Sequence, residues 1–325
     1  MKLRSTCGIR ITSAKSSSIY LFVLVGVFTL PAAAQHEDEN WRKKIAEVND
    51  DKAAENYIVF LGQAAKGDPA AQYQVAIRLY AGWGVTKDLE EAAKWFRKAA
   101  EQGFTHAQYE LGNRYYHGQG VKQDYREAVK WYQMVAEKGD AIAQVALADC
   151  YARGLGADSD LAKAAGLRRR AAVQGNADGQ RDLALQLFAG LGVAMDKSEA
   201  VLWMRKAADQ GNAHAQYYLG KFYSAGDGVA NDDAEAVRWY RLAAEQGHAQ
   251  AQALLGRHLG IGRGVAEDLV EAYAWLSLAG ESDPASDKSR KEMEGFLPNE
   301  KLKAGRALAA NLRKAISARL EAGGE

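Results

Sequence analysis

The sequence predicts an all-α protein, an α-solenoid of stacked helix-turn-helix repeats with helical caps. Two observations support this fold class. A set of glycine, aspartate, alanine and tryptophan residues recurs every 36 residues, as from Gly67 to Gly103 to Gly139, and apolar residues recur within each period at helical spacing. The composition agrees, because 48% of the 325 residues are apolar and 26% are charged, as in a globular protein.

The first 34 residues are predicted to be a secretory signal peptide rather than part of the fold. Residues 19–30 (IYLFVLVGVFTL) form a short apolar core, and residues 31–35 (PAAAQ) provide small residues for cleavage after Ala34. The core is preceded by four cations, Lys2, Arg4, Arg10 and Lys15. We expect a mature chain that begins near Gln35 and is periplasmic or secreted. The alternative is an uncleaved N-terminal anchor.

The charge of the chain excludes two classes of partner. Its formal net charge of +1 becomes −3 when the four cations of the signal are removed, and a mildly acidic protein has no electrostatic affinity for nucleic acid or anionic membranes. No later stretch is apolar enough to span a membrane, and we expect a monomer. The mature chain keeps one cysteine, Cys150, which cannot form an internal disulfide and which we expect to be buried.

The repeat is uninterrupted over six units. We number each unit from its first glycine, position 0, which is Gly67, Gly103, Gly139, Gly175, Gly211 or Gly247. Every unit also has glycine at positions 15 and 17, aspartate at position 21 and alanine at position 25. Five units have tryptophan at position 28, namely Trp95, Trp131, Trp203, Trp239 and Trp275, whereas the third has Leu167.

Each unit is predicted to contain two helices. The first, helix A, has small or apolar residues at positions 4, 8, 9 and 12, which lie on one side of a helix. The second, helix B, has them at positions 25, 28, 32 and 33, and we expect the tryptophan at position 28 to be the main core residue. One unit cannot bury both faces alone, so identical units are expected to stack.

The glycine pair between the helices, as in GQGVKQDYREAVKWY (residues 118–132), has two interpretations. It could cradle a phosphate, but such a loop follows a β-strand, whereas this one follows a helix in all six units. It is therefore predicted to end helix A, with the aspartate at position 21 capping helix B. A glutamate at position 24 gives the spacing of a capping box in five units. Position 0 ends helix B, and Asp68, Asp140, Asn176 and Asn212 are predicted to cap the next helix A, with Pro69 at its first position.

These units, for example AQYELGNRYYHGQGVKQDYREAVKWYQMVAEKGD (residues 107–140), resemble the Sel-1-like repeat, a relative of the tetratricopeptide repeat. The resemblance implies a right-handed α-solenoid that binds proteins or peptides, as adaptors, envelope scaffolds, regulators and virulence factors of the family do. The third unit departs from the pattern: it lacks the tryptophan, has Lys163 in place of the glutamate and carries RRR at residues 168–170, so we expect a looser joint there.

The predicted organisation has four parts. Residues 1–34 are the signal, 35–66 an N-terminal cap with a degenerate half repeat, 67–282 the six repeats and 283–325 the C-terminal capping helices. The last segment is predicted to form an amphipathic helix that covers the final repeat through Leu302, Leu308, Leu312, Ile316 and Leu320. A helix that binds a partner or a membrane is the alternative.

The sequence contains no catalytic, cofactor or metal motif that we can identify, so we predict a protein that is not an enzyme. His106 and Glu110 have the spacing of a metal-binding pair, but His117 is too far along the helix to join them, so no metal site is predicted. Some cysteine-rich relatives are described as β-lactam-binding hydrolases, yet this chain lacks their disulfides. A secreted hydrolase or virulence factor with an active site that the sequence does not reveal is the alternative to an envelope scaffold.

A protein or peptide partner is expected to bind a concave groove lined by helix A at positions 3, 7, 10 and 14. These positions lie on the side of helix A away from positions 4, 8 and 12, and their residues differ between units. Aromatic and arginine side chains often dominate binding energy at interfaces. The predicted groove residues are Tyr73, His106, Tyr109, Glu110, Asn113, His117, Asp149, Arg153, Tyr217, Tyr218, Lys221 and Arg257, of which Tyr73, Tyr109 and Tyr217 lie at the margin of these positions.

Overall fold

The computed structural model describes residues 50–324, and within this part of the chain all regular structure is helical. The predicted signal peptide and the beginning of the predicted N-terminal cap lie outside the described residues. The helices are α2 (Asp50–Ala64), α3 (Pro69–Ala81), α4 (Leu89–Glu101), α5 (Thr105–His117), α6 (Tyr125–Glu137), α7 (Ala141–Arg153), α8 (Leu161–Val173), α9 (Ala177–Ala189), α10 (Lys197–Asp209), α11 (Ala213–Ala225), α12 (Asp233–Ala244), α13 (Ala249–Ile261), α14 (Leu269–Ala279), α15 (Pro284–Phe296) and α16 (Asn299–Gly324).

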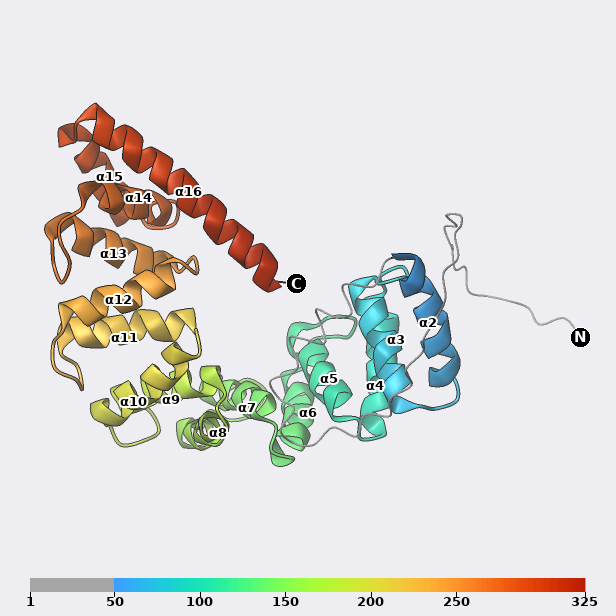
Figure 1. The fold of residues 1–325 in the computed structure, drawn as a ribbon. Helices are drawn as coiled ribbons and strands as arrows, with labels where there is room; N and C mark the ends of the chain where they lie inside the picture. Colours follow the sequence, from blue (N-terminus) through green and yellow to red (C-terminus); the bar gives the residue numbers. More distant parts are fainter. Residues whose placement is uncertain (1–49, 325) are drawn as a thin grey trace, which may run out of the picture.

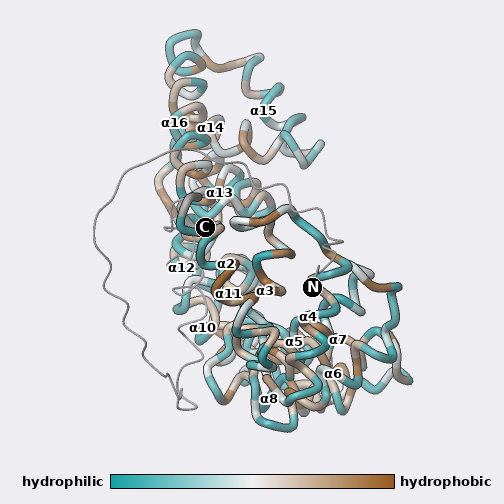
Figure 2. Tube along the Cα trace, turned by 90° about the vertical axis from the view of Figure 1, so that its right-hand side faces the viewer, coloured by the Kyte–Doolittle hydropathy of each residue, from teal (hydrophilic) through white to brown (hydrophobic). Residues whose placement is uncertain are grey.

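The helices form six antiparallel pairs that stack along an arc (Figure 1). Helix A of the repeats is α3, α5, α7, α9, α11 and α13, and helix B is the helix that follows each of them. From α2 to α15 each helix packs against the next along the chain, and α7 also touches α9, the next A helix. Apolar and polar residues alternate along most helices (Figure 2), because every helix has one face on its neighbours and one in solvent.

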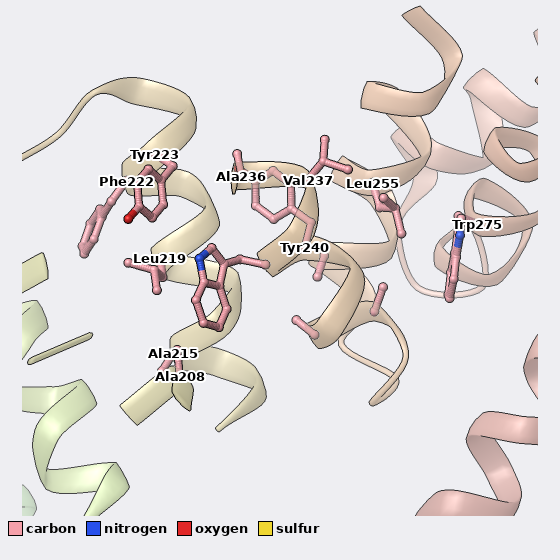
Figure 3. Packing of buried hydrophobic residues seen from close by; sticks show 14 of the residues in the cluster. Ala208, Ala215, Leu219, Phe222, Tyr223, Ala236, Val237, Tyr240, Leu255 and Trp275 are labelled. Atoms are coloured by element: carbon pink, nitrogen blue, oxygen red, sulfur yellow. The ribbon is translucent and has the colours of Figure 1, made fainter. Parts of the chain in front are cut away.

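The apolar positions predicted for helix A are buried, but the main core position of helix B is not the predicted one. Trp95, Trp131 and Trp203 at position 28 are only partly buried, and only Trp239 and Trp275 are fully covered. The neighbouring position 29 is buried in five of the six repeats, where it carries Phe96, Tyr132, Met204, Tyr240 and Leu276. Figure 3 shows Tyr240 of α12 in this core, with Leu219 of α11 and Leu255 of α13.

Position 9 of helix A is small because it faces position 29 of its own repeat. A Cβ at Gly112 would lie 2.7 Å from Cε1 of Tyr132, and a Cβ at Gly220 would lie 2.6 Å from Cε1 of Tyr240. The other repeat with glycine at this position is the sixth, in which Gly256 faces Leu276. The small residues thus admit the side chain at position 29 of the neighbouring helix B.

The two glycines of each turn have different tasks. Gly118 ends α5 in the left-handed conformation, with φ of 67°, which confirms the predicted helix end. Gly120 also has positive φ, at 72°, but it lies against the preceding repeat, where a Cβ would be 1.8 Å from the carbonyl oxygen of Leu89. The same close approach occurs at position 17 of every repeat, so this glycine joins one repeat to the previous one.

The aspartate at position 21 caps helix B in all six repeats, as predicted; Asp124, for example, accepts from the backbone N–H of Glu127. The reciprocal half of a capping box is not formed, because the backbone N–H of Asp124 donates to the carbonyl of Tyr115 instead. The glutamate at position 24 is therefore available to other partners. Glu199 pairs with Arg169 of the previous repeat at 2.7 Å and accepts from Nε1 of Trp203 at 3.0 Å.

A buried glutamine at position 5 closes each repeat, and we did not foresee it from the sequence. Gln216 donates to the carbonyl of Ala208 at the end of helix B of the previous repeat (3.1 Å) and accepts from Nε2 of Gln246 (2.7 Å) at the end of its own helix B. Gln144 and Gln180 repeat this arrangement with Gln174 and Gln210. The glutamine satisfies polar groups at the turn that would otherwise be buried without partners.

The two ends of the solenoid carry helices that do not belong to a complete repeat. Gly84 of the first repeat lies against the backbone of Ala53, so α2 occupies the place of a preceding helix B. At the other end α16 packs on α14 and runs back toward the interior of the arc (Figure 1). Leu302 is buried, whereas Leu320 near the end of α16 is 58% exposed. None of the described helices has the length and apolar character that crossing a membrane requires.

Candidate functional site

We call positions 3, 7, 10 and 14 of the A helices the inner stripe. Consecutive A helices touch through their side chains, as where the Arg114 guanidinium lies 3.9 Å from the ring centroid of Tyr80, or where Phe188 stacks on Phe222 with ring centroids 4.7 Å apart. Figure 1 shows α5 and α7 nearer the interior of the arc than α6 and α8, so the A helices form the concave face there.

The twelve residues predicted for the groove differ in exposure. His106, His117, Arg153, Lys221 and Arg257 are exposed, and Tyr109, Glu110, Asn113, Asp149, Tyr217 and Tyr218 are half-buried. Tyr73 is only 6% exposed, because it packs against Phe96 and Phe104 with ring centroids 5.8 and 5.3 Å away. Tyr73 is thus a core residue, and its prediction as a contact residue is not supported by its burial.

In the second repeat two polar residues of the inner stripe, Glu110 and Asn113, bind other side chains of the same repeat. Glu110 pairs with Arg114 of the same helix at 3.0 Å, and Asn113 accepts from the hydroxyl of Tyr132 at 2.7 Å. No group of three or more histidine, cysteine, aspartate or glutamate residues in the described part of the chain is arranged to bind a metal. The pair of His106 and Glu110 is therefore not joined by a third metal ligand.

The centre of the inner stripe holds a charged cluster that the sequence did not reveal. Arg168 occupies position 29, where other repeats have an apolar or tyrosine side chain, and its side chain is 11% exposed. It pairs with Asp149 at 2.6 Å and lies 3.8 Å from Asp182. Asp182 also pairs with Arg181, which binds Asp178. Within this cluster only the contact of Arg168 with Asp182 links the third repeat to the fourth, and the expected looser joint at this repeat stays a prediction.

In the fifth and sixth repeats the inner stripe is aromatic and basic. The rings of Tyr217 and Tyr218 lie edge to face with centroids 5.1 Å apart, and Nζ of Lys221 is 5.6 and 5.8 Å from their centroids. His248 stacks on Tyr217 at 4.7 Å and its Nε2 lies 3.1 Å from Nδ1 of His214. These rings form a platform that spans two repeats.

His248 also caps α13, a role that aspartate or asparagine has in most other repeats. Its Nδ1 accepts from the backbone N–H of Ala251 at 3.3 Å, so the neutral ring must carry its proton on Nε2, facing His214. Burial and the neighbouring His214 lower the pKa of His248 to about 4. A protonated ring could not accept from the helix terminus, so the cap requires the neutral form.

Cys150 lies in the core, as predicted, and does not face the inner stripe. It is fully buried, and this burial raises the pKa of its thiol to about 11. A thiol with a raised pKa is a poor nucleophile, because the thiolate is the reactive form. Cys150 therefore has a packing role.

A shallow hollow lies away from the inner stripe, on the turn of the second repeat. Its lining includes Arg97, Arg126, Asp124 and Glu127. Asp124 caps α6 and Glu127 pairs with Lys130, so these carboxylates already serve the local structure. The candidate site is better placed on the inner stripe, whose residues differ from repeat to repeat.

Six consecutive segments of the chain match the Sel1 repeat, at residues 69–104, 105–140, 141–176, 177–212, 213–248 and 249–284. The chain belongs to the Sel1 repeat family. Proteins of this family generally mediate interactions between proteins, and the fold is typically a non-enzymatic scaffold. No protein with a curated description matches the chain.

Two solved structures of Sel1 repeat proteins are similar to this one. The first is c5321, a protective antigen present in uropathogenic Escherichia coli strains, with a TM-score of 0.71 and 36% identity over 82% of this chain. This chain covers 56% of the length of c5321. The second is a Sel1 repeat protein from Oxalobacter formigenes, with a TM-score of 0.66, 30% identity, and coverage of 77% of this chain and 97% of that one.

Proposed function

We propose that the protein is a non-enzymatic scaffold or regulator of the bacterial envelope, which binds a protein or peptide through the inner stripe. The observation that supports this proposal is the difference between the two faces of helix A. Positions 4, 8, 9 and 12 carry small or apolar residues in every repeat and are almost all buried, whereas the inner stripe is solvent-accessible and changes from repeat to repeat. An accessible and variable face that carries tyrosine, histidine, arginine and lysine is suited to recognition.

The proposed location rests on the predicted signal sequence at residues 1–34. Mass spectrometry of the protein from its bacterium tests it: a mature N-terminus near Gln35 in the periplasmic or secreted fraction is expected. An intact Met1 in the cytoplasmic fraction would overturn the export proposal and leave the binding proposal standing.

The binding proposal is tested by affinity capture from envelope extract with the purified chain. A stoichiometric partner should be captured by the wild type and lost from the double variant Tyr218→Ala, Arg257→Ala, both on the inner stripe. Lys98→Ala, on the outer side of α4, is the matched control and should retain the partner. Circular dichroism and the melting temperature of each variant show whether the fold is intact. A partner retained by the double variant but lost on changing a B helix or α16 would place the interface elsewhere.

A further inference from the structure

The carboxylates of the inner stripe are all compensated within the chain. Glu110 pairs with Arg114, Asp149 with Arg168, and both Asp178 and Asp182 with Arg181. Each of these carboxylates lies within 3.0 Å of its guanidinium. The anionic side chains of this face are therefore already engaged and are poor sites for a cationic partner.

The cations of the inner stripe in the fifth and sixth repeats are not compensated in the same way. Lys221 has no carboxylate within ion-pair distance among the described residues, and its ammonium group rests over the rings of Tyr217 and Tyr218. Arg257, at the same position of the next repeat, is 47% exposed and reaches only Asp283, at 3.7 Å. Ile261 lies one turn further along α13 and is 71% exposed. This part of the stripe thus combines an unpaired ammonium group, Lys221, and a loosely paired guanidinium, Arg257, with exposed apolar surface.

The end of α16 adds positive charge beside the same two repeats. Helix α16 contains six lysine or arginine residues and two glutamates. Arg306, Arg313 and Arg319 pair with Glu294, Glu281 and Glu245. Lys301, Lys303 and Lys314 have no carboxylate within ion-pair distance among the described residues. The helix reaches the turn between α12 and α13, where Ile316 and Leu320 lie over Gly247 and Arg319 donates to the carbonyl of Glu245 at 3.2 Å. Gly247 precedes His248, whose ring stacks on Tyr217 at the margin of the inner stripe. A basic helix therefore borders the aromatic platform of a chain that is acidic overall after signal removal.

We infer that the inner stripe of the fifth and sixth repeats, bordered by α16, selects an acidic peptide segment of a partner protein. Aspartate or glutamate side chains of the segment pair with Lys221 and Arg257, and its apolar side chains pack on Tyr217, Tyr218 and Ile261. Charge complementarity of this kind chooses the partner and accelerates its association. The inference rests on the proposed function, because it names the kind of segment that the same face accepts.

Selection from a phage library of short random linear peptides on the purified full chain tests the inference. We expect the recovered peptides to be enriched in aspartate and glutamate. A synthetic copy of such a peptide should bind the double variant Lys221→Glu, Arg257→Glu about tenfold or more weakly than the wild type, with binding that weakens as salt rises. The matched control is Lys98→Glu, Lys206→Glu, which makes the same change of charge at two ammonium groups that lie over Trp95 and Trp203. It should bind like the wild type.

The outcomes separate the inference from the proposed function. Peptides without acidic enrichment that still require Tyr218 would overturn the acidic selectivity and leave a peptide-binding inner stripe. Acidic peptides that bind both charge-reversal variants equally would show that another surface recognises them, which also overturns the inference. If no peptide is enriched, or if none depends on any residue of the inner stripe, the inference is wrong, and the proposed function is then decided by the affinity capture from envelope extract.

Discussion

Gly120 of the second repeat lies so close to Leu89 of the first that a Cβ on the glycine would be 1.8 Å from the leucine carbonyl oxygen. A side chain at Gly120 would force the two repeats apart, because the opposing atom is backbone and cannot move alone. At Gly118 the nearest atom to an added Cβ is Cβ of Gln123, at 3.2 Å, and a small shift relieves this contact.

We therefore predict that Gly120→Ala lowers the free energy of unfolding by several kcal/mol. Gly118→Ala should lower it by about 1 to 2 kcal/mol, the cost of a left-handed conformation for an L-residue. Urea unfolding followed by circular dichroism measures both values. Equal losses for the two variants would contradict the role of Gly120 in joining the repeats.

The residue at position 29 should contribute more to stability than the tryptophan beside it. Phe96 is completely buried, so Phe96→Ala is expected to cost about 3 to 5 kcal/mol. Trp95 is partly exposed and lies under Nζ of Lys98, 3.9 Å from the ring centroid, so Trp95→Ala should cost distinctly less. Thermal unfolding of the two variants gives the comparison. A larger loss of stability for Trp95→Ala than for Phe96→Ala would show that position 28, and not position 29, is the main core position of helix B.

The glutamine at position 5 should stabilise the turn through its partner at the end of helix B. Gln216→Leu removes the bonds to Ala208 and Gln246 and should cost about 1 to 2 kcal/mol. Gln246→Leu should cost less, because Gln246 is nearer the surface. A double-mutant cycle of the pair measures their coupling. If the two effects simply add, the hydrogen bond between the two side chains has no stabilising role.

The histidine cap of α13 predicts a loss of stability in acid. The folded state lowers the pKa of His248 from 6.5 to about 4, so the unfolded chain binds the proton more readily. The neutral ring therefore stabilises the folded state fully above pH 6.5, and this contribution to the free energy of unfolding is lost as the pH falls from 6.5 toward 4. The titratable groups in contact with it are His214 and Tyr217 of α11. Glu245 and Arg319, on the adjoining turn and on α16, are bonded to each other.

His248→Asn tests this dependence, because asparagine caps the equivalent helices through Asn176 and Asn212. The variant should lose less stability than the wild type between pH 7 and pH 5, measured as the change in melting temperature. His258, whose pKa burial also lowers, should leave some acid sensitivity in both proteins. Identical pH profiles would show that His248 does not control the stability of this junction.

The helices, their ends and the repeat were predictable from the sequence, because these features depend on contacts between near neighbours in the chain. The aspartate at position 21, the left-handed glycine at position 15 and Pro69 all act within one or two turns of a helix, so their residue type and spacing indicate their conformation. The burial of positions 4, 8 and 12 follows from helical periodicity in the same way. The accessible, variable positions 3, 7, 10 and 14 could also be named, whereas Tyr73, beside them at position 6, is buried.

Contacts between helices decided what the sequence left open. Positions 28 and 29 are adjacent and both carry large residues, so periodicity cannot tell which of them points between the helices. The answer depends on how far helix B is rotated against position 9, and this rotation is set by the packing of the whole pair. Likewise, Gly120 approaches Leu89, which is 31 residues away in the sequence, and Gln216 is hydrogen-bonded across a turn. Arg168 meets Asp182 only because the fourth repeat stacks on the third. Only the tertiary structure brings residues so far apart in the sequence into contact. The repeat pattern shows the residues that all units share, but it does not show which side chains meet at the positions where the units differ.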